Sequence, residues 1–85
     1  MAIFLVQVVD RAERFADVAA VHDAFEADLG LWFISSELTL SRLYHALKHQ
    51  LRPHGPLFVA PMPSPPKFKN LRPGALAWVR RHYRA

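Results

Sequence analysis

The sequence predicts a small α+β fold, and three features lead to that expectation. Its 85 residues suffice for one domain with one hydrophobic core, and 52% of them are hydrophobic. Short runs of β-branched and aromatic residues, typical of strands, alternate with segments whose apolar residues have helical spacing. The chain has no cysteine, so neither disulfides nor thiolate metal sites contribute to its stability.

The first half of the chain predicts strand, helix and strand. Residues 3–9 read IFLVQVV, a run typical of a central strand that is buried on both faces. A helix is expected over residues 15–29, because Phe15, Val18 and Phe25 fall on one helical face. Gly30 suits the position just after a helix end, and a second strand is expected over residues 31–34.

The second half predicts helix, strand, loop and helix. Leucines and Tyr44 recur at helical spacing over residues 40–51, with Thr39 or Ser41 as the cap. A third strand is expected over residues 57–60, which read LFVA. Residues 61–66 hold four prolines and favour an extended loop.

A closing helix is expected to begin at Pro73, which suits a first helical position, and to carry an apolar stripe. The whole order indicates a ferredoxin-like small antiparallel sheet with two packed helices and an extra C-terminal helix. Its parts are a β-α-β-α-β core over residues 1–60, a Pro-rich loop over 61–70 and the C-terminal helix over 71–85. One face of such a sheet needs a cover, either a second protomer or the C-terminal helix, and we expect a homodimer.

Charge is divided unevenly along the chain. All seven acidic residues lie in the first 37 residues, where two arginines oppose them. Residues 38–85 hold nine of the 11 lysines and arginines, four of the five histidines and no acid. This division predicts an anionic partner, either nucleic acid or an acidic protein surface, unless the basic half folds against the acidic half and cancels its field.

The predicted helix over residues 40–51 concentrates this positive charge on one side. Its basic residues, continued by Arg52, lie opposite the leucines: Arg42, His45, Lys48, His49 and Arg52. Further basic residues downstream extend the candidate nucleic-acid-binding set, chiefly Lys67, Lys69, Arg80 and Arg81. The set suits phosphate contacts, and it also suits an ordinary solvated helix face. The aromatic residues between them, Phe68, Trp78 and Tyr83, favour the core over a stacking platform.

No segment predicts a cofactor site or a membrane span. The apolar run at the N-terminus is too short for a signal peptide or a span, so we expect a cytoplasmic protein without a membrane partner. His45 and His49 have the spacing of a metal-binding pair but lack a third ligand. Asp10 follows the first strand, where a carboxylate can hold Mg²⁺ or cap the following turn.

Two segments resemble a known family. IFLVQVVD, which ends in Asp10, and FISSELTLSRLYHALKHQLRPHGPLFVAP resemble the ferredoxin-like adaptation subunit of CRISPR systems and its SinR-like relatives. PGALAWVRRHY is similar to the closing helix of the SinR-like branch. The resemblance implies dimerisation through the sheet, association with nucleic acid or with a nucleic-acid enzyme, and a weak metal role for Asp10.

The sequence therefore favours a small non-catalytic binding module that binds nucleic acid or accompanies a nucleic-acid-processing complex such as CRISPR adaptation. The alternative is a protein-interaction module, such as a phage- or plasmid-encoded inhibitor of the anti-CRISPR kind or one half of a toxin–antitoxin pair. Catalysis is not expected, because metal-assisted cleavage needs several carboxylates around the ion and the sequence assigns only Asp10.

Overall fold

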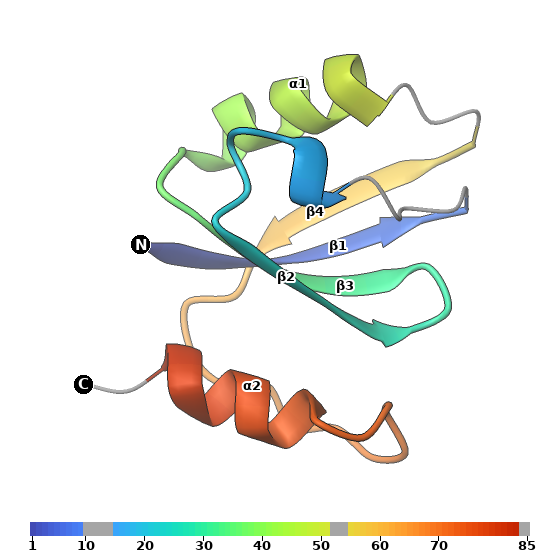
Figure 1. Ribbon diagram of the computed structural model, residues 1–85, viewed down its shortest axis with the longest axis vertical. Helices are drawn as coiled ribbons and strands as arrows, with labels where there is room; N and C mark the ends of the chain where they lie inside the picture. The colour runs from blue at the N-terminus through green and yellow to red at the C-terminus, as the bar shows by residue number, and fades with distance from the viewer. Residues whose placement is uncertain (10–14, 52–54, 84–85) are drawn as a thin grey trace.

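The computed structural model describes residues 1–9, 15–51 and 55–83, and shows one four-stranded antiparallel sheet between two helices (Figure 1). The elements in chain order are β1 (Ala2–Val8), the 3₁₀ helix η1 (Phe15–Asp17), β2 (Asp23–Asp28), β3 (Leu31–Ser36), α1 (Leu40–Leu51), β4 (Leu57–Pro61) and α2 (Ala75–His82). The strand order across the sheet is β2-β3-β1-β4. The expected α+β class is therefore confirmed.

The prediction for the first strand is confirmed, and its two apolar faces pack into two separate cores. Phe4, Val6 and Val8 point toward α1 and join Leu43 and Leu47 there. Their neighbours Ile3 and Leu5 point to the opposite face and pack with α2. A strand whose two faces are covered by α1 and α2 needs apolar side chains in both directions, as the IFLVQVV run supplies.

The helix expected over residues 15–29 is wrong. Residues 15–17 form a short 3₁₀ helix, and Asp23–Asp28 is a strand that pairs antiparallel with β3. Side chains of β2 alternate between the two cores: Ala24 packs on the α1 side, while Phe25 and Ala27 pack on the α2 side. The helical spacing arises because residues of the 3₁₀ segment and of the strand are buried separately, and pairing with β3 overrides a modest helix propensity.

Contrary to the expectation from the sequence, Gly30 does not follow a helix end. It has φ 74°, and its place is the turn of the β2–β3 hairpin instead of a helix end. A Cβ at this position would lie 2.3 Å from the Val8 carbonyl oxygen. The hairpin turn therefore requires glycine both for its backbone angle and for the close approach of β1.

The two helices lie on opposite faces of the sheet (Figure 1). Of the two packed helices expected on one face, only α1 is observed, because residues 15–29 form a 3₁₀ turn and a strand. Of the two covers that we expected for the second face, the structure shows the C-terminal helix. Trp78, Val79 and Ala75 of α2 are buried against Phe33 and Ile3. The open face that motivated the homodimer is thus occupied, and the oligomeric state stays a prediction.

The remaining elements agree with the sequence, apart from the start of the closing helix. The strand over residues 31–34, the helix over 40–51 and the strand over 57–60 are confirmed with small changes of length. α2 begins at Ala75 with Gly74 as its N-cap, so Pro73 lies before the helix and is not its first residue. Gly74 has φ 97°, and a Cβ there would press within 3.3 Å of the Phe25 ring, which favours glycine at this cap.

Replacing Gly30 with alanine should destabilise the fold by about 2 kcal/mol or more, because the left-handed backbone disfavours a Cβ and the new atom overlaps Val8. Urea denaturation measures the change. Leu29→Ala is the control, since Leu29 is 84% exposed in the same turn and should change stability little. Equal stabilities of the two variants would contradict the hairpin geometry.

Candidate nucleic-acid interface

The helix α1 is fixed at its start by a side-chain cap and along its length by leucines. Of the two predicted caps, Thr39 is the one observed: its Oγ1 accepts a hydrogen bond from the Arg42 amide at 3.3 Å. Leu43 and Leu47, on the inner side of α1, are fully buried. These contacts hold the opposite side of α1 toward solvent.

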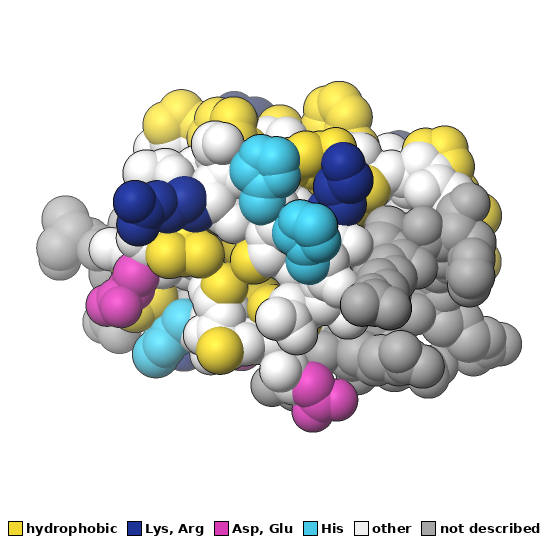
Figure 2. All heavy atoms as spheres, turned by 90° about the horizontal axis from the view of Figure 1, so that it is seen from above, with side chains coloured by type: hydrophobic (Ala, Val, Ile, Leu, Met, Phe, Trp, Pro, Cys, Tyr) yellow, Lys and Arg dark blue, Asp and Glu magenta, His cyan; other side chains and the backbone are white. Residues whose placement is uncertain are grey.

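That outward side carries the predicted basic residues. Arg42, His45, Lys48 and His49 are all exposed, as the buried leucines on the other side require. Figure 2 looks onto this side of the molecule, and shows Lys, Arg and His side chains over α1. We call these four residues the α1 basic face. Arg52, the fifth member of the predicted set, lies outside the described residues.

The charges of the α1 basic face are not neutralised by the acids that the structure describes. None of the ion pairs among the described residues includes Arg42 or Lys48. The Lys48 Nζ lies 5.9 Å from the centre of the Tyr44 ring, and that ring contacts His45 edge-on at 5.2 Å. A cation over an aromatic face keeps its charge, so Lys48 remains a donor for an anionic ligand.

Lys67, Lys69, Arg80 and Arg81 are also exposed, but they belong to the other side of the molecule. Arg80 and Arg81 lie on α2, while Lys67 and Lys69 flank Phe68, which packs into the α2 core. Because the sheet separates α1 from α2, these residues do not extend the α1 basic face. Their aromatic neighbours Phe68, Trp78 and Tyr83 belong to the α2 core, as the sequence favoured.

Acids of β2 compensate part of the charge on the α2 side. Arg72 donates to Glu26 Oε1 at 2.5 Å, and Arg81 lies 3.9 Å from Asp23 Oδ2. Surface pairs of this kind contribute little to stability, but they reduce the local positive field. The acidic and basic halves of the chain therefore compensate each other's charge at the C-terminal segment. Among the described residues, no ion pair provides such compensation for α1.

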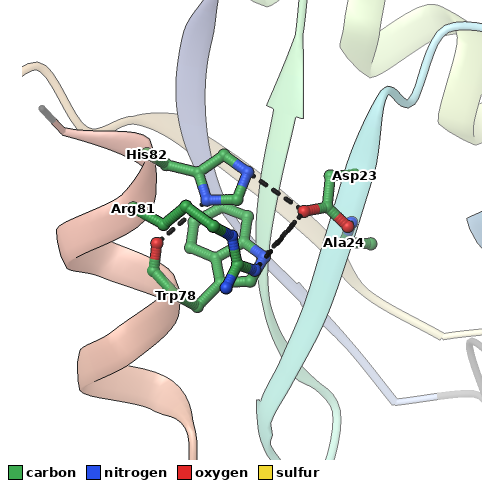
Figure 3. Close-up of polar contacts among 5 residues, drawn as sticks. All are labelled: Asp23, Ala24, Trp78, Arg81 and His82. Carbon is green, nitrogen blue, oxygen red and sulfur yellow. Dashed lines mark hydrogen bonds and ion pairs between the residues drawn. The ribbon is translucent and has the colours of Figure 1, made fainter.

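Asp23 is the centre of a polar cluster that joins β2 to α2 (Figure 3). Its Oδ2 accepts from Trp78 Nε1 at 3.2 Å and lies 3.0 Å from His82 Nε2. The other carboxylate oxygen accepts from the Ala24 amide at 2.9 Å. The rings of Trp78 and His82 stack at 3.8 Å, so one carboxylate, one indole and one imidazole form a single latch.

Both ring nitrogens of His82 make contacts within the latch. Nδ1 lies 2.9 Å from the Trp78 carbonyl oxygen, and Nε2 lies 3.0 Å from the Asp23 carboxylate. The imidazole is therefore held between α2 and β2 by groups of the protein itself. We therefore assign the latch to the attachment of α2.

Sequence reasoning missed this latch. It placed Asp23 on a helix, and nothing in the sequence pairs a residue of the N-terminal half with Trp78 and His82 near the C-terminus. Only the β2 strand, together with the crossing of α2 over the second face, brings these residues into contact.

The predicted metal residues receive no support from geometry. Asp10 lies outside the described residues. Within the described ranges, no group of three or more His, Asp or Glu side chains is arranged to hold a metal ion, and this holds for His45 and His49 as well.

Comparison with known proteins adds no relative to this picture. No family model, no curated protein and no solved structure matches the chain. Neither α1 nor α2 has the length and hydropathy of a membrane span, in the part of the chain that the structure describes.

Asp23→Ala should lower stability by roughly 1–2 kcal/mol, because it leaves the largely buried Trp78 indole without its acceptor and removes the partner of His82. Thermal denaturation measures the loss. Asp28→Ala is the matched control, because Asp28 is exposed and bonds only to the neighbouring Leu29 amide among the described residues. Equal losses of stability in the two variants would show that the contacts of Asp23 with Trp78 and His82 do not stabilise the fold.

The environment of Tyr83 should make the stability of the fold depend on pH in the alkaline range. Its hydroxyl donates to the Met62 carbonyl at 2.7 Å, and burial raises the pKa of the Tyr83 phenol above its usual 10.0. A raised pKa in the folded state means that this contribution to stability is complete below pH 10 and is lost as pH rises through the folded pKa.

Tyr83→Phe should therefore cost about 1 kcal/mol at neutral pH and flatten the fall in stability above pH 10. Urea midpoints measured from neutral to alkaline pH give both effects. Tyr44→Phe serves as the control, and its urea midpoints should fall with pH as steeply as those of the unmodified protein. An unchanged alkaline slope in Tyr83→Phe would show that this phenol does not set it.

Proposed function

We propose that the protein is a non-catalytic module that binds nucleic acid through the α1 basic face. The observation that carries the proposal is the contrast between the two helices. Among the described residues, Arg42 and Lys48 of α1 form no ion pair with an acid, whereas basic residues of the α2 side pair with Asp23 and Glu26. A stripe of cations without counter-charges is the electrostatic footprint of a phosphate ligand.

The chemistry of the α1 basic face suits the sugar–phosphate backbone better than base edges. Arg42 and His49 lie seven residues apart on a helix, a rise of roughly 10 Å, so the face reaches only a few phosphates. Contacts to phosphate position a protein without reading sequence. Binding should therefore be modest in affinity, strongly dependent on salt and similar for different sequences.

We further propose that the fold is a variant of the ferredoxin-like plan. Its order of strand, connection, hairpin, helix and strand matches a β-α-β-β-α-β unit in which a 3₁₀ turn stands where the first helix would be. A role beside a nucleic-acid-processing complex such as CRISPR adaptation stays a prediction from the resemblance and is a narrower form of the same proposal.

The protein-interaction alternative has less support from geometry. It rested on the acidic segment over residues 17–28 and on the basic C-terminal half. Two of those acids belong to β2 and pair with basic residues of that half: Asp23 with His82 of α2, and Glu26 with Arg72 just before α2. An inhibitor or a toxin–antitoxin component stays a prediction without a specific surface to carry it.

Charge reversal on α1 tests the proposal. Arg42→Glu with Lys48→Glu should weaken binding to short single- and double-stranded DNA or RNA probes at least tenfold at low salt, about 1.4 kcal/mol, measured by fluorescence anisotropy. The unmodified protein should lose roughly two log units of affinity per log unit of salt on duplex DNA if two phosphates are neutralised.

The matched control is Lys67→Glu with Arg80→Glu, which changes the net charge by the same amount on the opposite side of the sheet. It should retain most of the affinity. Equal losses in the two double variants would mean that net charge alone drives association, and absence of binding by the unmodified protein to every probe at low salt would end the proposal.

A further inference from the structure

The two edges of the sheet differ in a way that points to an interaction surface. β2 forms one edge and carries Asp23, Glu26 and Asp28, with an irregularity in pairing between the last two. Charged side chains and bulges keep an edge from pairing with another strand. β4 forms the other edge. Its sequence LFVAP has no charge, and β1 is its sole neighbour among the described strands.

The register fixes which backbone groups of β4 face outward. The Met62 amide donates to the Ile3 carbonyl at 2.8 Å, which continues the β1–β4 ladder. Because bonded and non-bonded pairs alternate in an antiparallel ladder, Phe58 and Ala60 also bond to β1. Leu57, Val59 and Pro61 then direct their backbone groups away from the sheet. Pro61 has no N–H, and none is needed for the β1 ladder because Pro61 occupies an outward-facing position.

The side chains of β4 divide between the sheet faces by the same alternation. Leu57 and Val59 pack into the α1 core, while Phe58 points to the face that α2 covers elsewhere. α2 does not reach Phe58, which is 57% exposed and does not belong to the α2 core. The edge therefore combines outward amide groups with an exposed aromatic side chain.

We propose that β4 pairs with β4 of a second copy of this chain, antiparallel, with the two-fold axis at Val59. In this register each Val59 N–H donates to the other copy's Val59 carbonyl, and each Leu57 N–H donates to the other copy's Pro61 carbonyl. Every outward N–H of β4 gains an acceptor. Pro61 needs only to accept, so the strand is complementary to itself.

The side chains in this register favour a second copy over other occupants. Phe58 lies opposite Ala60 of the second copy in a non-hydrogen-bonded pair, where Cα atoms are about 4.5 Å apart and a large side chain packs against a small one. An uncharged strand meets its own copy without repulsion. The β2 edge would instead bring carboxylates together.

The expected dimer is weak, because a pair of five-residue strands buries less than a standard interface. It is distinct from the homodimer that the sequence suggested, since it uses the sheet edge and leaves the α2-covered face intact. It does not depend on the proposed nucleic-acid binding, and its tests contain no nucleic acid.

Sedimentation velocity from roughly 10 μM to roughly 1 mM should show a concentration-dependent dimer. Phe58→Lys places a charge at the edge and should raise the dimer dissociation constant at least tenfold, about 1.4 kcal/mol, with an unchanged circular dichroism spectrum. Leu76→Lys is the matched control, because Leu76 on α2 is 51% exposed and lies away from β4. It should dimerise like the unmodified protein.

Cysteine cross-linking tests the register, since the chain has no native cysteine. A mixture of Phe58→Cys and Ala60→Cys proteins should form disulfide dimers faster than either protein alone, because a Cα separation of about 4.5 Å suits a disulfide. A protein that stays monomeric over the whole range, a Phe58→Lys variant that dimerises like Leu76→Lys, or equal cross-linking in all samples would overturn the proposal.

Discussion

Burial of β1 on both faces is the constraint on which the rest of this structure depends. A strand with apolar residues in both directions stays in water-free surroundings only if each face of the sheet has a cover. α1 supplies one cover and α2 the other, and each meets its own set of β1 side chains. The described residues therefore form a sheet between two single helices.

The two helices are attached to the sheet by different kinds of contact. α1 is connected to β3 by a short turn and holds its place through fully buried leucines. α2 is short and follows a proline-rich loop, and its attachment combines buried Trp78 with the hydrogen bonds and ion pairs that Asp23 and Glu26 provide. The acids of β2 thereby have two effects. They bind the C-terminal segment, and their charge disfavours pairing of the β2 edge with another strand.

This use of the acids shapes the electrostatics of the whole surface. Carboxylates engaged with α2 cannot neutralise α1, which faces the other way across the sheet (Figure 1). Basic residues lie on both sides of the sheet, but the ion pairs among the described residues lie on the α2 side. The α1 side presents cations to solvent, and the α2 side is partly compensated.

The sequence by itself determined the two elements with the clearest local patterns, a continuous apolar run and a single helical stripe. IFLVQVV required a central strand, and the leucines of residues 40–51 required a helix with its basic residues outward. Exposure of Arg42, His45, Lys48 and His49 followed from the same helical pattern.

Only the tertiary structure decided the remaining features, because they depend on residues distant in the chain. Phe15, Val18 and Phe25 have helical spacing, yet they bury into two different cores once β2 pairs with β3. The Asp23 latch and the separation of Lys67 and Arg80 from the α1 basic face follow from the passage of α2 across the second face of the sheet. A local pattern records which residues are buried, but the partner that buries them is set by packing of the whole chain.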